Sequence, residues 1–182
     1  MKLHIILASS LATLTACASL DGPPRVAVKF GVPQPDDYSR THLGWDFNAG
    51  TGTPVYAAAA GRVTVATTVN DFYGTVQQWP KVEILHDNGE STFYLHIDRV
   101  QVRAGDKVER GQLIAHTALT GPGGRGSYLA RQEQTQWPHL HLELHNEYSR
   151  RIDPAQRSWG CPGEKTDYWW PIGCRPQRSQ VR

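Results

Sequence analysis

The chain has 182 residues, of which 39% are hydrophobic, and a formal net charge of +2. This length predicts one globular domain with a substantial core. The near-neutral charge argues against a nucleic-acid partner and against a basic arm that binds membranes.

Residues 1–16 have the pattern of an export signal, with one Lys followed by an uncharged, largely apolar stretch that is too short to span a bilayer. The segment ends in Leu14-Thr15-Ala16-Cys17, which resembles the lipobox of bacterial lipoproteins. By that resemblance the chain is cleaved before Cys17, which then carries acyl chains. The alternative is an ordinary signal peptide that ends near a cysteine. Because no later stretch is apolar enough to span a membrane, we expect a lipid anchor.

Residues 17–40 are rich in Pro, Gly and Asp and are expected to form a tether with an edge strand at 26–30. Residues 41–156 are expected to form the folded domain, in which short β-type runs alternate with glycine. We predict an all-β fold, a compact antiparallel sheet. The expected strands lie at 54–57, 62–66, 82–86, 91–96, 100–102, 112–115 and 139–145.

Asn88-Gly89 separates two of these runs and predicts a β-hairpin with a two-residue turn, because both residues tolerate positive φ. In that register Phe93 and Leu95 lie on one face of the strand and His96 lies on the other. Since the two apolar residues are expected to face the core, His96 is expected to face outward into a groove.

Two segments lack the strand pattern. Residues 121–136 are polar and glycine-rich, which predicts a long surface loop that is functional or mobile. Residues 157–182 contain Trp, Pro and Cys and are expected to form an irregular tail packed on the domain. With Cys17 lipidated, Cys161 and Cys174 remain as a pair in an exported chain, and such pairs are usually disulfides. The alternative, a metal site, needs more ligands than this tail contains.

The segment His139–His145 alternates strictly between leucine and a histidine or glutamate. On a strand, successive side chains point to opposite faces, so three leucines share one face and imply a core. His139, His141, Glu143 and His145 share the other face. The alternative is a half-exposed strand whose polar side chains face solvent, but three histidines on one face favour a functional site.

A catalytic zinc site needs three protein ligands and an open position. One strand that offers two imidazoles cannot enclose an ion alone. His42 and Asp46 lie in a short segment with a glycine between them, and they offer an imidazole and a carboxylate that can converge on the same ion. The His-x3-Asp spacing is a weak signal alone and a stronger one beside His139-x-His141.

Taken in order, these motifs resemble the lysostaphin-type peptidoglycan endopeptidases over residues 41–154. The matching motifs are His42-x3-Asp46, GTPVYA at 52–57, GRV at 61–63, YLH at 94–96, AGDKV at 104–108, GQLI at 111–114 and HLHLE at 139–143. The resemblance implies a compact antiparallel β fold with a groove that holds one zinc ion. It also implies that His42, Asp46 and His141 ligate the ion, while His139 and His96 are catalytic.

In this assignment zinc polarises the scissile carbonyl and acidifies water. His139 is the main general base, which takes a proton from water and passes it to the leaving amine. His96 hydrogen-bonds the water or the developing oxyanion.

The remaining polar residues have less defined roles. His145 lies about 13 Å beyond His141 along a strand, too far to bind the same ion. Glu143 is nearer and is either a partner of a ligand or a solvent-facing residue. His86 is expected to be structural, and His116 is expected to lie at the surface.

The resemblance implies a zinc endopeptidase that hydrolyses peptide cross-links of bacterial peptidoglycan, with the stem peptides as its partners. One alternative is a metal-free member of the same fold that regulates other wall hydrolases, although such members generally lack ligands that are present here. A biotinyl- or lipoyl-carrier module is disfavoured because no Met-Lys-Met or Asp-Lys-Ala motif occurs. By the resemblance to bacterial lipoproteins, Ala18 rather than Asp after Cys17 implies the outer membrane, facing the periplasm. The cleaved bond and the oligomeric state stay open.

Overall fold

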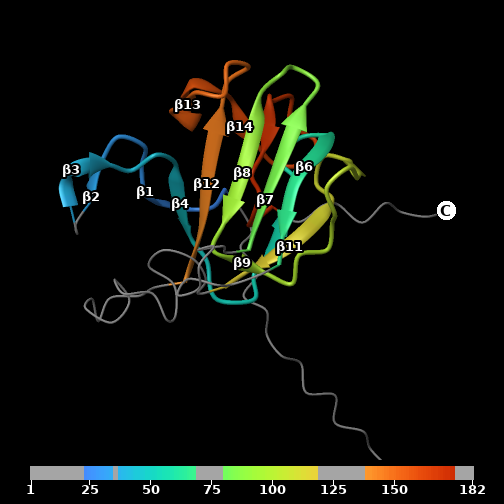
Figure 1. The fold of residues 1–182 in the computed structure, drawn as a ribbon, viewed down its shortest axis with the longest axis horizontal. Coiled ribbons are helices and arrows are strands. Elements are labelled where there is room, and N and C mark those ends of the chain that lie inside the picture. Colours follow the sequence, from blue (N-terminus) through green and yellow to red (C-terminus); the bar gives the residue numbers. More distant parts are fainter. Residues whose placement is uncertain (1–22, 35–36, 69–79, 119–137, 175–182) are drawn as a thin grey trace, which may run out of the picture.

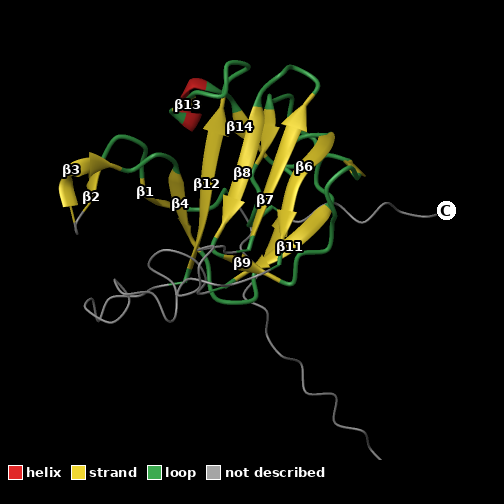
Figure 2. Cartoon of the chain, in the orientation of Figure 1, coloured by secondary structure: helices red, strands yellow, loops and turns green. Residues whose placement is uncertain are grey.

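The computed structural model describes residues 23–34, 37–68, 80–118 and 138–174. Within these residues the regular structure consists of strands and one short 3-10 helix, η1 (Pro154–Gln156), with no α-helix (Figure 2). The all-β prediction is therefore confirmed. None of the described residues belongs to a helix that is long and apolar enough to cross a membrane.

An eight-stranded sheet forms the main body of the fold (Figure 1). Its order is β1-β4-β12-β8-β7-β6-β10, and β13 pairs with β12. Every pairing is antiparallel. Because β12 lies between β4 and β8, strands from distant parts of the chain meet at its two sides. The bounds are β1 (Val26–Val28), β4 (Trp45–Asn48), β6 (Gly61–Thr67), β7 (Lys81–His86), β8 (Ser91–Leu95), β10 (Lys107–Val108), β12 (His139–His145) and β13 (Arg151–Ile152).

Smaller sheets complete the described fold. One has the antiparallel order β5-β11-β9, a second pairs β2 with β3, and a third pairs β14 with β15 in parallel. Val55, Ile97 and Ile114 of the first of these are completely buried and join the same core as the main sheet. The bounds are β2 (Pro33–Gln34), β3 (Asp37–Thr41), β5 (Pro54–Tyr56), β9 (Ile97–Asp98), β11 (Leu113–Thr117), β14 (Trp159–Gly160) and β15 (Tyr168–Trp169).

The core lies against one face of the main sheet. Leu140, Leu142 and Leu144 of β12 are completely buried, as their alternation predicts. Phe47 of β4 pairs with Leu140, and Tyr94 of β8 pairs with Leu142, so both fall on the same face and are also completely buried. Burying each large apolar side chain contributes about 1.5–3 kcal/mol. This packing fixes which face β12 turns toward the candidate site.

The β7–β8 hairpin differs from the predicted two-residue turn at Asn88-Gly89. The amide of His86 donates to the carbonyl of Glu90 over 2.8 Å, which leaves three residues in the loop. Gly89 has a φ of +82°, the left-handed conformation that ends a three-residue hairpin loop. The longer loop shifts the strand pairing by one residue, and such a shift exchanges the two faces of a strand.

The expectation that Phe93 and Leu95 face the core is therefore wrong. Phe93 pairs with Glu143 and Leu95 pairs with His141, so both half-buried side chains lie on the site face. Tyr94, between them, points into the core. An apolar strip thus runs along the floor of the site, beside the polar residues of β12.

The C-terminal segment packs against the core face. The ring centroid of Trp45 lies 5.7 Å from that of Trp159 and 6.0 Å from that of Trp170. Because neighbouring side chains of a strand point to opposite faces, Trp45 anchors β4 from one side while Asp46 faces the other. The aromatic cluster therefore supports the strand that carries a predicted ligand.

A disulfide joins Cys161 to Cys174, with 5.4 Å between their Cα atoms. It closes the segment that contains β14 and β15. The tail expected at 157–182 is thus more ordered in its described part than an irregular segment, because it holds a short parallel strand pair.

Candidate metal centre

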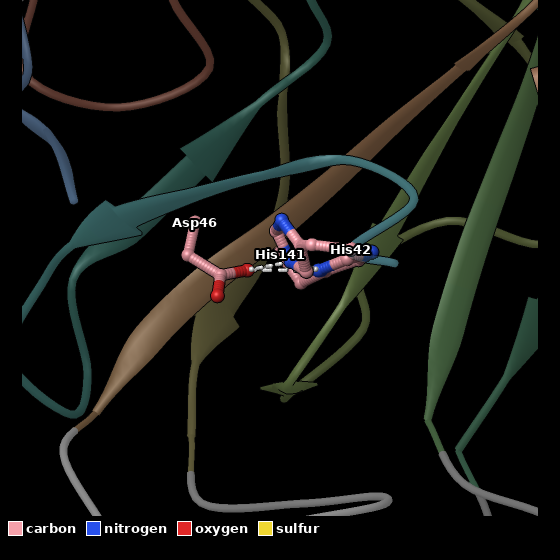
Figure 3. Close-up of side chains that lie close together, drawn as sticks. All are labelled: His42, Asp46 and His141. Atoms are coloured by element: carbon pink, nitrogen blue, oxygen red, sulfur yellow. Dashed lines mark hydrogen bonds and ion pairs between the residues drawn. The ribbon is translucent and has the colours of Figure 1, made fainter. Parts of the chain in front are cut away.

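Three side chains from two distant segments converge beside β12 (Figure 3). His42 Nε2 lies 3.1 Å from Asp46 Oδ1 and 3.0 Å from His141 Nδ1. His141 Nδ1 lies 2.8 Å from the same Asp46 oxygen. Two nitrogens and one oxygen therefore form a nearly equilateral triangle, and all three residues are buried.

Strand pairing brings Asp46 and His141 together, because they are direct partners of β4 and β12. His42 precedes β4, and its backbone amide donates to the carbonyl of Val32 over 2.7 Å. Its ring Nδ1 lies 3.0 Å from the carbonyl oxygen of Lys29, which can only accept a hydrogen bond. Since Nδ1 therefore carries the proton, Nε2 presents its lone pair to the centre of the triangle. Residues 29–32, within the expected tether, thus orient a predicted ligand.

Gly44 permits the close approach of the His42–Asp46 segment to β12. A Cβ atom at this position would collide with the carbonyl oxygen of Leu142 and would lie 2.9 Å from His141 Nε2. Any larger residue would therefore push the segment away from β12. The role of the glycine between the two predicted ligands is therefore steric.

The electrostatics of the triangle favour an ionised carboxylate beside imidazoles. Burial acts to raise the pKa of Asp46, but hydrogen bonds with His141 and His42 outweigh it and hold that pKa well below its usual range. Burial acts to lower the pKa of His141, but contacts with Asp46 and Glu143 outweigh it and raise the pKa to about 9. Both shifts have the sign expected where surrounding carboxylates stabilise positive charge, and the same surroundings would favour a bound cation.

Two further histidines flank this triangle. His139 Nε2 lies 3.7 Å from Asp46 Oδ1. The ring centroid of His96 lies 4.4 Å from that of His139 and 6.0 Å from that of His141. The His139 side chain is 21% exposed, against 6% for His42 and 11% for His141. The structure thus brings all five predicted site residues into one cluster and leaves His139 the more accessible.

His96 reaches the cluster through an unusual backbone conformation. Its φ is +58°, in the left-handed region that residues other than glycine rarely adopt. It stands between β8 of the main sheet and β9 of the smaller sheet, where the amide of Ala118 donates to its carbonyl over 2.8 Å. The chain changes sheets at this residue, and its side chain turns toward His139. Strained backbone of this kind is found at functional sites.

The other histidines lie apart from the triangle. His86 is buried, with Nδ1 2.9 Å from the Ala60 carbonyl and Nε2 2.9 Å from Thr92 Oγ1, which is a structural arrangement. His145 stacks on Phe93 with ring centroids 4.0 Å apart. The half-buried His116 lies on β11, whereas we expected a surface residue. Cys17 and the expected loop 121–136 fall outside the described residues.

Comparison with known proteins identifies the family. Residues 40–154, more than half of the chain, match the model of peptidase family M23. The chain belongs to this family. A relative, the peptidoglycan DD-endopeptidase ShyA of Vibrio cholerae, is 39% identical over 103 residues, which are 57% of this chain and 20% of ShyA. The M23 chain described here thus spans about a fifth of that relative's length.

Solved structures agree with this assignment. Lysostaphin from Staphylococcus simulans superposes with a TM-score of 0.56 at 25% identity, covering 75% of this chain and 50% of that one. A zinc-containing peptidase from Vibrio cholerae superposes with a TM-score of 0.52 at 27% identity, covering 72% of this chain and 36% of that one. The resemblance to lysostaphin-type enzymes inferred from the motifs is confirmed.

The donor set of this M23 domain fits a zinc ion. Two ligand atoms bound at about 2.0–2.1 Å to a tetrahedral ion lie about 3.3 Å apart. The three pairs within the triangle are separated by 2.8, 3.0 and 3.1 Å. Two imidazole nitrogens and one carboxylate oxygen are also a usual ligand set of catalytic zinc, which leaves a fourth position for water or substrate.

The sequence did not indicate every residue that shapes the site. The Lys29 carbonyl that orients His42 is a backbone atom, which has no side-chain signature. Arg151 lies outside the alternating segment, yet its Nε donates to Glu143 Oε2 over 2.7 Å. The sequence gives one indication of this contact: Arg151 is a basic residue that follows shortly after the strand that carries Glu143.

Proposed function

We propose that this M23 domain is a zinc endopeptidase that hydrolyses peptide cross-links in bacterial peptidoglycan. The observation that carries the proposal is the triangle of His42, Asp46 and His141 beside the more exposed His139. The similarity to ShyA, whose name describes a peptidoglycan DD-endopeptidase, supports the substrate class. We assign the catalytic domain to residues 41–156 and the packed tail to 157–182.

In this proposal His42, Asp46 and His141 hold one zinc ion. When bound, the ion supplies a Lewis acid that polarises the scissile carbonyl and lowers the pKa of water toward 7. His139 accepts a proton from the attacking water at its ring nitrogen and delivers it to the leaving amine. His96, beside His139, donates a hydrogen bond to the oxyanion that develops on the carbonyl. The half-buried Phe93 and Leu95 form an apolar floor for the substrate.

The bond proposed for cleavage joins D-alanine to diaminopimelate in the cross-links of a Gram-negative wall. The lipobox-like sequence that ends at Cys17 supports an acyl anchor in the outer membrane, which would hold the domain in the periplasm within reach of the wall. Both proposals accord with the disulfide, since an oxidising compartment preserves it.

The test uses purified cross-linked muropeptide dimers and protein that carries one equivalent of zinc. We expect hydrolysis to monomers with the mass gain of one water per cross-link, loss of activity with a chelator, and its return when zinc is added. Dimers joined between two diaminopimelate residues serve as the control substrate. Protein that binds zinc and leaves every cross-link intact would contradict the enzyme assignment. Protein that binds no zinc but stimulates another wall hydrolase would support the regulator alternative.

A further inference from the structure

Glu143 is a buried carboxylate that faces a predicted metal ligand. It follows His141 by two positions on β12, so both side chains lie on the site face. Glu143 Oε1 lies 3.5 Å from His141 Nε2. This is the ring nitrogen that points away from the triangle, because Nδ1 is the atom that faces His42 and Asp46. The carboxylate therefore lies on the side of the His141 ring that is opposite the triangle.

The second oxygen of Glu143 is held by two nitrogen donors, one from an imidazole and one from a guanidinium group. His145 Nε2 and Arg151 Nε each lie 2.7 Å from Oε2. The His145 ring is packed on Phe93, and Arg151 is placed by the antiparallel pairing of β13 with β12. With Oε2 fixed from two sides, Oε1 is turned toward His141. Residues on two strands thus determine the orientation of one carboxylate.

A carboxylate in this position affects the ligand in two ways. Its negative charge, 3.5 Å from His141 Nε2, favours the tautomer that carries the proton on this nitrogen, which keeps the lone pair of Nδ1 directed at the centre of the triangle. It also makes the imidazole a stronger donor to a cation, and outer partners of this kind typically change metal affinity by about 10–100-fold. The hydrogen bond of His42 to the Lys29 carbonyl has the same effect on the other imidazole.

We infer that Glu143, braced by Arg151 and His145, is a positioning residue that holds His141 for zinc binding. This inference rests on the proposed function, because it concerns the same metal site. Of the two roles expected for Glu143 from the sequence, partner of a ligand or solvent-facing residue, the inference selects the first. Arg151 then affects His141 only indirectly, by holding Glu143.

The test compares zinc dissociation constants, measured by competition with a chromophoric chelator, for wild type, Glu143→Gln and Glu143→Ala. We expect zinc affinity to fall by about 10–100-fold in Glu143→Ala, less in Glu143→Gln, and less again in Arg151→Gln. Glu83→Ala is the matched control, because Glu83 pairs with Phe93 on the same sheet face, two strands away from Glu143. Its affinity should equal that of the wild type.

A spectroscopic readout separates positioning from mere stability. In ¹⁵N-labelled, zinc-loaded protein the Nε2 proton of His141 should be slow to exchange and shifted downfield, and both features should be lost in Glu143→Ala. If that variant does not fold, the isosteric Glu143→Gln decides the matter. Zinc affinity and imidazole signal unchanged in Glu143→Gln and Glu143→Ala would overturn the inference. Failure of the wild type to bind zinc would instead overturn the proposed function.

Discussion

The histidines of the cluster differ in their burial and in the atoms that their ring nitrogens face. His42 and His141 are buried, and each has one ring nitrogen facing an oxygen outside the triangle, which leaves the other directed at Asp46. His139 is more exposed and lies at 3.7 Å from the same carboxylate. A ligand gains from a fixed ring, whereas a proton carrier needs access to water and substrate. These differences support the proposed division of the cluster into ligands and a proton carrier.

Gly44 should tolerate no larger residue. Because a Cβ atom there meets the Leu142 carbonyl, Gly44→Ala should destabilise the fold by about 1–3 kcal/mol and weaken zinc binding. The measurements are the midpoint of thermal unfolding and the zinc dissociation constant. Gly50→Ala is the control, because a Cβ atom at Gly50 has no neighbour within 4 Å. Equal behaviour of the two variants would show that the close approach at Gly44 does not matter.

Glu90 should make stability depend on acid pH. Burial acts to raise its pKa, but hydrogen bonds from Arg157, Tyr168 and Asn88 outweigh burial and hold the pKa below the ordinary value of 4.5. Its stabilising effect is therefore present above pH 4.5 and is lost as the pH falls below that value. Glu90→Gln should lower the free energy of unfolding at pH 7 by about 1.5–3 kcal/mol.

The pH dependence distinguishes this effect from a simple packing defect. The free energy of unfolding is measured with denaturant at pH 7 and at pH 3. The difference in this free energy between wild type and Glu90→Gln should be smaller at pH 3. The exposed Glu109 provides the control, since Glu109→Gln should have the same free energy of unfolding as the wild type at both pH values. A gap that is constant with pH would mean that the ionised carboxylate does not contribute.

At the scale of elements, the alternation of β12 was sufficient to predict its two faces. The leucines are completely buried and the histidines line the site, because a period of two admits one arrangement when one face is apolar. The β7–β8 hairpin was not predictable in the same way. Asn88-Gly89 suits a two-residue turn, but Gly89 serves equally as the last residue of a three-residue loop. Local turn chemistry left the register ambiguous, and core packing of Tyr94 resolved it.

The candidate site was predictable to the extent that it consists of side chains with metal-binding chemistry. His42, Asp46 and His141 could be named because their residue types and spacing are informative. The change of sheet at His96 and the carbonyl of Lys29 depend on tertiary pairing, which leaves no trace in local sequence. Arg151 reaches Glu143 only because β13 folds back on β12.

The disulfide should stabilise the C-terminal element without affecting the chemistry of the site. The two cysteines are 13 residues apart in the sequence. A cross-link of this span lowers the conformational entropy of the unfolded chain, which stabilises the fold by roughly 3 kcal/mol. The double variant Cys161→Ser with Cys174→Ser should therefore unfold at a lower denaturant concentration and still bind one zinc ion. Treating the wild type with a reductant should reproduce this loss and should leave the double variant unchanged. Unaltered stability in both experiments would contradict this prediction.

At the scale of the whole molecule, the N-terminal sequence predicts where the domain is held. If Cys17 is acylated, intact-mass measurement of protein extracted from membranes should show the mass of acyl chains on that residue. Cys17→Ser should release the protein into the soluble periplasmic fraction while purified domains retain equal activity. A soluble wild-type protein with an unmodified Cys17 would exclude the anchor.

The central claim is that one cluster contains three zinc ligands and two catalytic histidines. It is tested by measuring bound zinc by elemental analysis, together with muropeptide cleavage, for alanine variants of the five residues. The variants are His42→Ala, Asp46→Ala, His141→Ala, His139→Ala and His96→Ala.

We predict that the first three variants lose zinc and activity together. His139→Ala should keep its zinc and lose about 10²–10⁴-fold in turnover, the usual size of a general-base effect, and His96→Ala should also keep its zinc and lose turnover. Equal loss of zinc in all five variants, or full cleavage by protein without zinc, would contradict the account.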